Sequence, residues 1–150
     1  AEGWRRRTEL VPGNAESAPD RFGEAVALDG DTAVVGAPGD GSGGAYVFEQ
    51  TESGWTRRAR LTATAVGSDD DFGWSVAYTG GMAVVGAPKA GENGHAYVFR
   101  AADDWTARRL VPKNPWGNTE FGFAVALHDT TALVGAPAFE ETSPAYLFEL

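Results

Sequence analysis

A short motif recurs three times along the chain at a nearly constant spacing. AVVGAP occupies residues 33–38 and 83–88, and ALVGAP occupies residues 132–137. The pair Phe-Gly recurs in step at residues 22–23, 72–73 and 121–122, which gives intervals of 50 and 49 residues. A fixed period of this length indicates copies of one supersecondary unit that bury their faces against each other. The sequence therefore predicts a repeat protein with three units.

Each unit contains four short runs that are typical of strands. In the first copy the runs are 22–28, 32–38, 44–50 and 54–63, and turns rich in glycine and aspartate separate them. The run 32–38 is almost continuously apolar, as in a strand buried on both faces, whereas 54–63 alternates and carries charge. We expect an antiparallel sheet with 32–38 in its interior and 54–63 as its outer strand.

Composition supports an all-β fold and excludes two classes of partner. The chain has 20 glycines and 8 prolines, which suits strands joined by tight turns. Its formal net charge is −9, and this sign opposes binding to nucleic acid or to anionic membranes. No apolar run approaches the roughly 18 residues that span a bilayer. We expect no nucleic-acid partner and no membrane insertion.

Four antiparallel strands in about fifty residues are typical of a β-propeller blade. The units resemble FG-GAP repeats, because Phe-Gly and Gly-Ala-Pro keep their register in all three copies. These repeats are the blades of the integrin α-subunit head and of many bacterial and archaeal secreted proteins. The resemblance implies one propeller domain over residues 1–150, with units near 3–50, 54–99 and 104–150. It also implies an extracellular or cell-surface location.

The order of the strands leaves the sheets at both ends incomplete. Each unit begins with its outer strand, which is 3–11 in the first unit, and the last strand is 144–150. Strand 144–150 therefore has no outer neighbour along the chain, and strand 3–11 has no sheet of its own. Propellers typically have about 4 to 8 blades, so three four-stranded blades are too few to close a ring. A free apolar edge is a feature that soluble proteins avoid.

We expect a second copy to complete the sheets. Two chains joined head to tail through a heterologous contact would form a ring of about six blades. The contact would bring Trp4, Arg6 and Leu10 of one chain beside Tyr146 and Phe148 of the other. An open filament is one alternative, and a fragment of a longer propeller is another. The function expected in each case is a non-catalytic binding or structural module.

One rim of the predicted blades gathers acidic and aromatic residues. The loops before Phe-Gly and after Gly-Ala-Pro share this rim, which carries ligand binding in the integrin heads that the units resemble. It could bind a basic protein or stack a sugar, so a carbohydrate-binding lectin is a further alternative. For Trp74 the favoured interpretation is packing between blades, together with Phe123. The candidate ligand residues are Asp40, Asp69, Asp70, Asp71, Trp74, Glu92, Trp116, Phe139 and Glu140.

Neither a metal site nor a catalytic site is predicted. Some FG-GAP repeats hold calcium in an Asp-rich loop before their second strand, but the corresponding turns at 28–32, 78–82 and 127–131 are too short to wrap an ion. The two histidines, His95 and His128, fall on opposite rims and cannot form a joint metal or catalytic site. We therefore expect no cofactor, no calcium and no enzymatic activity.

Overall fold

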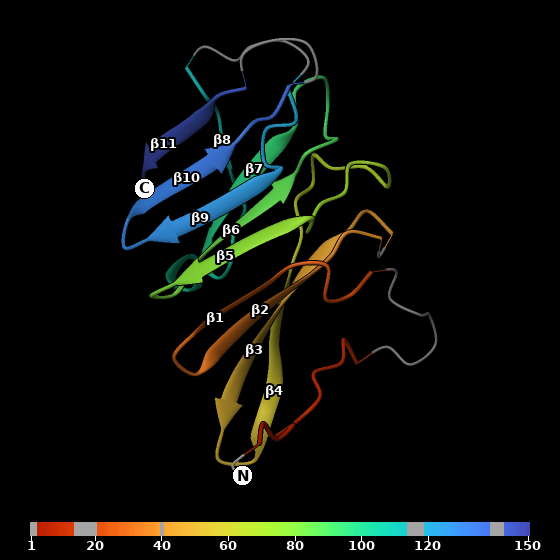
Figure 1. Ribbon diagram of the computed structural model, residues 1–150, viewed down its shortest axis with the longest axis vertical. Coiled ribbons are helices and arrows are strands. Elements are labelled where there is room, and N and C mark those ends of the chain that lie inside the picture. The colour runs from red at the N-terminus through yellow and green to blue at the C-terminus, as the bar shows by residue number, and fades with distance from the viewer. Residues whose placement is uncertain (1–2, 14–20, 40, 114–118, 139–142) are drawn as a thin grey trace.

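The computed structural model describes residues 3–13, 21–39, 41–113, 119–138 and 143–150. These residues form three antiparallel sheets that follow one another along the chain (Figure 1). The first blade consists of β1 (Val26–Asp29), β2 (Thr32–Ala37), β3 (Gly44–Thr51) and β4 (Gly54–Leu61). The second blade consists of β5 (Ser75–Thr79), β6 (Met82–Ala87), β7 (His95–Arg100) and β8 (Arg108–Leu110). The third blade consists of β9 (Ala124–His128), β10 (Thr131–Gly135) and β11 (Ala145–Glu149).

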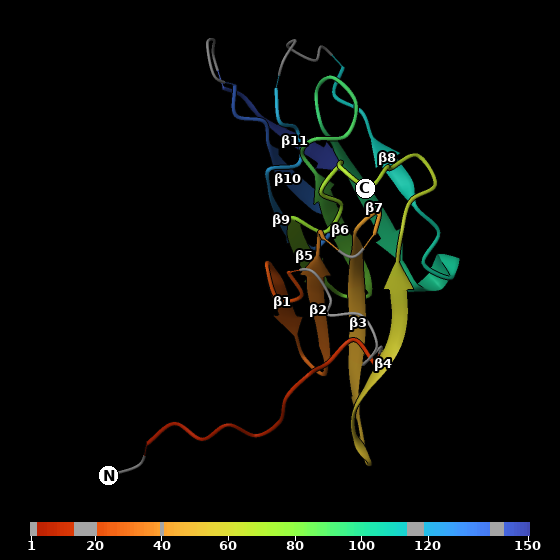
Figure 2. The ribbon, with the colours of Figure 1, turned by 90° about the vertical axis from the view of Figure 1, so that its right-hand side faces the viewer.

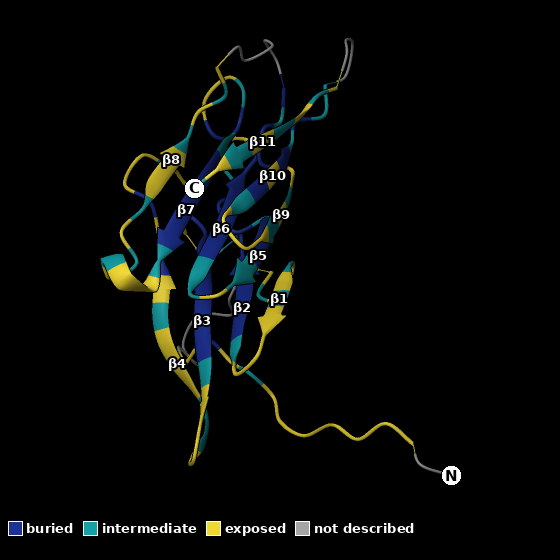
Figure 3. Ribbon diagram, turned by 90° about the vertical axis from the view of Figure 1, so that its left-hand side faces the viewer, coloured by how far each residue is buried: buried dark blue, intermediate teal, exposed yellow. Residues whose placement is uncertain are grey.

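Strands that are neighbours in sequence are neighbours in each sheet. The first two blades have the orders β1-β2-β3-β4 and β5-β6-β7-β8, and the third has the order β11-β10-β9. The central strands β2, β3, β6 and β7 are largely buried, whereas β1 and β4 carry many exposed residues (Figure 3). The all-β class and the propeller-blade topology are thus confirmed. Each of the first two blades has four strands, and three strands are described in the third blade.

The first strand of each blade is shorter than the sequence pattern indicates. The run 22–28 was expected to be one strand, but β1 begins only at Val26. The Phe-Gly pair lies in a turn before the strand, and Gly23, Gly73 and Gly122 have φ values of +94°, +98° and +93°. Glycine adopts this left-handed backbone without a steric cost, which explains why a glycine stands there in every unit. The turn ends the preceding loop and sets the start of the strand.

The phenylalanine of each Phe-Gly pair packs on its own blade. Phe22 meets Tyr46 edge to face with their ring centroids 5.7 Å apart. The second blade repeats the contact between Phe72 and Tyr97, and the third repeats it between Phe121 and Tyr146. Each ring thereby anchors the Phe-Gly turn to the third strand of its blade.

Adjacent blades pack face to face. The strand β1 contacts β5, and β5 contacts β9, so the first strands of the blades lie side by side. Between the first and second blades, Val34, Val47 and Phe99 belong to one buried cluster. Between the second and third blades, Val84 and Ala132 belong to another. These apolar faces are the main source of stability in a repeat fold of this kind.

The N-terminal segment does not form a strand in the single chain. Residues 3–12 have no regular structure, and the segment runs away from the sheets (Figure 2). Its inner end is attached to the first blade, because Leu10 packs against that blade and the Arg57 guanidinium donates a hydrogen bond to the carbonyl oxygen of Pro12. A strand needs a partner for its ladder of hydrogen bonds, and no described strand pairs with the segment 3–11.

Candidate functional site

The blades are joined by glycines that touch the backbone of the next blade. A β-carbon on Gly36 would lie 2.0 Å from the carbonyl oxygen of Gly73, and one on Gly86 would lie 1.9 Å from that of Gly122. Only glycine permits so close an approach. The glycine of each Gly-Ala-Pro motif is therefore one half of a joint, and the Phe-Gly turn of the following blade is the other half.

A second glycine completes each joint from the start of the third strand. A β-carbon on Gly43 would lie 2.1 Å from the carbonyl oxygen of Phe72. An isolated parallel β-bridge also joins Gly43 to Phe72. In the second blade, a β-carbon on Gly94 would lie 2.4 Å from the carbonyl oxygen of Phe121. The Phe-Gly turn is thus held between two glycines of the preceding blade.

The first and third blades each present half of such a joint that no other described blade contacts. A β-carbon on Gly135, the Gly-Ala-Pro glycine of the third blade, would meet no described atom closer than 3.6 Å, and that atom belongs to Ala124 of the same blade. A β-carbon on Gly23 of the first blade would meet no described atom within 4 Å. The third blade offers the Gly-Ala-Pro half of a joint and the first blade offers the Phe-Gly half, so the two open halves are complementary.

The free face of the third blade is apolar and exposed. Leu133 and Leu147 are cross-strand partners, and they occupy the same positions as the pair Val34 and Val47 in the first blade. Both valines are fully buried by the second blade, whereas Leu133 is 42% exposed and Leu147 is 72% exposed. Exposed leucines in these positions are typical of a surface that another blade covers, and the described part of the chain contains no such blade.

The first blade has a matching free face on its opposite side. Val26 and Leu28 on β1 are 70% and 69% exposed, whereas Val76, the counterpart of Val26 in the second blade, is buried. A shallow apolar groove runs across this face and is lined partly by Leu10 and Trp55. The free faces of the first and third blades are the candidate functional site.

The residues predicted for self-association lie partly on these faces. Trp4 and Arg6 are exposed on the N-terminal segment, and Leu10 is half-buried against the first blade. The strand β11 lies at the edge of its described sheet, as expected. Its side chains Tyr146 and Phe148 are not the exposed ones, because they face Phe121 with ring centroids 5.6 Å and 5.9 Å away.

Alternation along β11 accounts for this difference, because successive side chains of a strand point to opposite faces. Tyr146 and Phe148 point toward the second blade, and Leu147 between them points away from it. Leu133 and Leu147 are not among the residues predicted from the sequence. Their correspondence to the buried valines of the first two units was the signal that could have revealed them.

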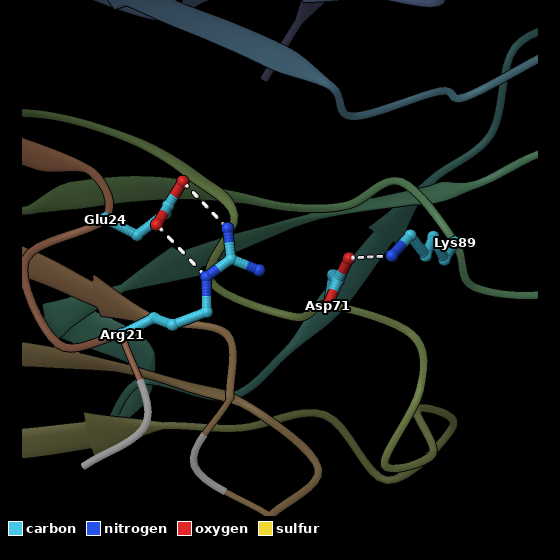
Figure 4. A network of polar contacts seen from close by, with 4 residues as sticks. All are labelled: Arg21, Glu24, Asp71 and Lys89. Carbon is cyan, nitrogen blue, oxygen red and sulfur yellow. Dashed lines mark hydrogen bonds and ion pairs between the residues drawn. The ribbon is translucent and has the colours of Figure 1, made fainter.

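Loops of two kinds meet at one rim, as the strand order predicts. Lys89 follows a Gly-Ala-Pro motif and Asp71 precedes a Phe-Gly pair, and their charged groups are 2.8 Å apart (Figure 4). The hydrogen bond and the charge of Asp71 raise the pKa of Lys89. Arg21 and Glu24 form a second ion pair at 3.0 Å in the first blade.

The candidate ligand residues of this rim do not gather into one site. Asp71 is engaged by Lys89, and the carboxylate of Asp70 accepts a hydrogen bond from the backbone N–H of Gly67 at 2.6 Å. Asp69 and Glu92 are exposed. Among the described residues, no group of three or more His, Cys, Asp or Glu is placed to hold a metal ion. The predicted rim residues outside the described ranges are Asp40, Trp116, Phe139 and Glu140.

The aromatic residues of the rim form a row across the blades. The ring of Trp74 in the second blade lies 5.6 Å from that of Phe123 in the third. The Arg21 guanidinium of the first blade lies 4.9 Å from the centroid of the Trp74 ring. Trp74 therefore packs between blades, as the favoured interpretation of the sequence predicts.

A small hollow of about 260 Å³ lies at the same rim between the second and third blades. It is lined partly by His95 and Arg109, and the Nδ1 atom of His95 is 3.1 Å from the hydroxyl of Tyr97. Burial, and then the charge of Arg109, lower the pKa of His95. The other histidine, His128, is the exposed last residue of β9. His95 begins β7 and His128 ends β9, so the two histidines lie at opposite ends of their sheets.

Three blades joined by Phe-Gly turns and Gly-Ala-Pro glycines define a repeat protein of the β-propeller class. The sequence model of the FG-GAP repeat matches residues 4–48, 55–99 and 105–148, and the chain belongs to the FG-GAP repeat family. Repeats of this family are typical of binding or structural modules that are not enzymes, and of extracellular proteins. The search of curated proteins gave no match. No helix in the described part of the chain is long and apolar enough to cross a membrane.

Proposed function

We propose that this FG-GAP module works outside the cell by binding further copies of itself, with the third blade of one copy on the first blade of the next. The observation that carries the proposal is the pair of complementary open joint halves, Gly135 at one end and the Phe22-Gly23 turn at the other. The exposed leucines of the third blade and the exposed Val26 and Leu28 of the first blade would cover each other.

The internal blades supply the register of the proposed contact. Leu61 pairs with Ala45 in the first blade, and Leu110 pairs with Ala96 in the second. By the same register, Leu10 of one copy would pair with Ala145 of another, and residues 3–11 would become the outer strand of its third blade. The contact would add a ladder of hydrogen bonds to the apolar cover.

The tryptophans that recur once per unit, near the outer strands, support this arrangement. Trp55 and Trp105 are half-buried against the blade cores, whereas Trp4 is fully exposed. A blade of another copy would offer Trp4 the cover that the other two already have. Docking therefore removes a large exposed aromatic side chain from water as well as the two apolar faces.

A ring of two chains is the assembly that the blade number favours. Six blades lie within the usual range of about 4 to 8, whereas three chains would give nine. A heterologous contact that does not close extends into a filament. Further blades of a longer chain would cover the same faces in the same way.

Sedimentation velocity over a range of concentrations tests the proposal. We expect a species with the mass of two chains, and a Leu147→Glu variant that associates roughly 100-fold more weakly, because a charge would be buried against an apolar face. Ser53→Glu, on the exposed turn before β4, is the matched control and should leave association unchanged. A mass that keeps growing with concentration would identify the filament. A folded single chain at all concentrations up to about millimolar would contradict self-association.

A further inference from the structure

The turns that follow β1 and β5 touch between the first and second blades. Asp29 ends β1, and its Oδ2 atom accepts hydrogen bonds from the Thr79 hydroxyl at 3.2 Å and from the backbone N–H of Gly80 at 3.0 Å. Thr79 and Gly80 occupy the corresponding turn of the second blade. The last residue of β1 therefore contacts the last residue of β5, the equivalent strand of the next blade.

The strand registers identify the residues that would meet between copies. Asp29 pairs with Thr32, Thr79 with Met82, and His128 with Thr131, so Asp29, Thr79 and His128 are equivalent. Where two copies join, His128 takes the position of Asp29, and Asp29 of the next copy takes the position of Thr79. We infer that His128 of one copy pairs with Asp29 of the next. The inference rests on the proposed head-to-tail contact and adds its recognition pair.

The charged groups around this position are mainly carboxylates. His128 is exposed, and its Nε2 atom is 3.5 Å from Asp129 on the same turn. Glu149, on β11, accepts a hydrogen bond from the Thr131 hydroxyl. The neighbouring copy would contribute Asp29 and Asp31. Its other nearby acid, Glu49, is already paired with Arg58 at 3.7 Å.

An imidazolium at His128 would offset the repulsion between these acids. The hydrogen bonds from Thr79 and Gly80 both go to Oδ2 of Asp29, so Oδ1 can accept a bond from the imidazolium. Without the proton, the joint sets the acids of two copies against each other. The pair therefore stabilises the contact most when the histidine is charged.

The pair also gives the contact its direction. A joint between two first blades would place Asp29 against Asp29, and a joint between two third blades would place His128 against His128. Only the head-to-tail order brings opposite charges together. Because the charge of histidine changes between about pH 5 and 8, the affinity between copies should rise on acidification.

The dissociation constant between copies, measured by sedimentation equilibrium at pH 7.5 and pH 6.0, tests the pair. We expect the wild type to bind about twofold to fivefold more tightly at pH 6.0, the range for an exposed ion pair. His128→Lys should bind tightly at both pH values, since its charge does not change. His128→Gln should bind weakly at both. His95→Gln removes the other histidine and should keep the pH dependence of the wild type.

Two results would overturn the inference, and they differ in what else they affect. If the wild type associates but His128→Gln retains its full pH dependence, the pair is excluded and self-association stands. If the wild type stays a single chain at both pH values, the proposed function fails and the pair fails with it. A thermal melt of each variant shows that the fold is kept, as expected for an exposed turn residue.

Discussion

Gly86 in the second blade and Gly122 in the third are joined through their backbones, because a β-carbon on Gly86 would lie only 1.9 Å from the Gly122 carbonyl oxygen. The same oxygen accepts a hydrogen bond from the buried Ser75 hydroxyl at 2.7 Å. The contact between blades is thus fixed by main-chain atoms and one small side chain. The first and second blades meet in the same way through Gly36 and Gly73.

Alanine at Gly86 and alanine at Gly135 should have opposite effects on fold and assembly. Gly86→Ala forces a buried backbone contact apart and should lower the free energy of unfolding by about 1–3 kcal/mol. Gly135→Ala meets only ordinary contacts in the single chain, so its stability should change by less than about 0.5 kcal/mol while self-association weakens. Urea unfolding and sedimentation on both variants measure the two effects. Equal destabilisation by both would contradict the assignment of Gly135 as an open half-joint.

Ser143→Gly should strengthen the contact between copies. The register of the third strands makes Ser143 equivalent to Gly43 and Gly94, whose absent β-carbons leave room for the next blade. In the proposed assembly a serine β-carbon would keep the contact with Phe22 of another copy wider, so its removal should lower the dissociation constant roughly threefold to tenfold. The entropic cost of glycine and the loss of the hydroxyl's exposed hydrogen bonds with the Ala138 backbone would reduce this gain. Ser53→Gly is the control. An unchanged constant would mean that copies do not meet as the internal blades do.

The stability of the folded chain should fall on acidification partly through His95. Burial and the Arg109 charge lower the pKa of His95 in the folded state, so the unfolded chain binds this proton more readily. The contribution is complete above the ordinary histidine pKa near 6.5 and is lost as the pH falls. Between pH 7 and pH 5, His95→Gln should lose less stability than the wild type in urea titrations. Identical slopes would exclude the effect.

Calcium removal should leave the melting temperature unchanged. The turns between first and second strands contain two residues, Gly30 and Asp31 in the first blade, and cannot supply the six or more oxygen ligands that calcium requires. Melting curves in EDTA and in millimolar calcium chloride provide the measurement. An upward shift with calcium, absent with magnesium, would show a site that the turns do not account for.

The blade repeat could be predicted from the sequence, but the position of Phe-Gly could not. The 50-residue period and the apolar runs predict the sheets because burial imposes both patterns. The run from Phe22 to Leu28 looks like a continuous strand, yet Gly23 has a positive φ and β1 starts later. Propensity does not reveal this turn, since the reason for it is the neighbouring blade.

The open joint halves could be predicted only in outline. The strand order indicated which strands lacked partners, but it directed attention to Tyr146 and Phe148, which face the second blade. The exposed positions, Leu133 and Leu147, follow from knowing which face of each sheet meets the next blade. That orientation depends on the twist and packing of the sheets and is not encoded in a local pattern.

Joints made of carbonyl oxygens and glycines have a consequence for how such proteins grow. A Gly-Ala-Pro glycine meets the Phe-Gly turn of the next blade through backbone atoms, so this part of the contact is the same whatever side chains fill the remaining positions. Duplication of the coding segment would therefore lengthen the protein by whole blades, without the evolution of a new complementary surface.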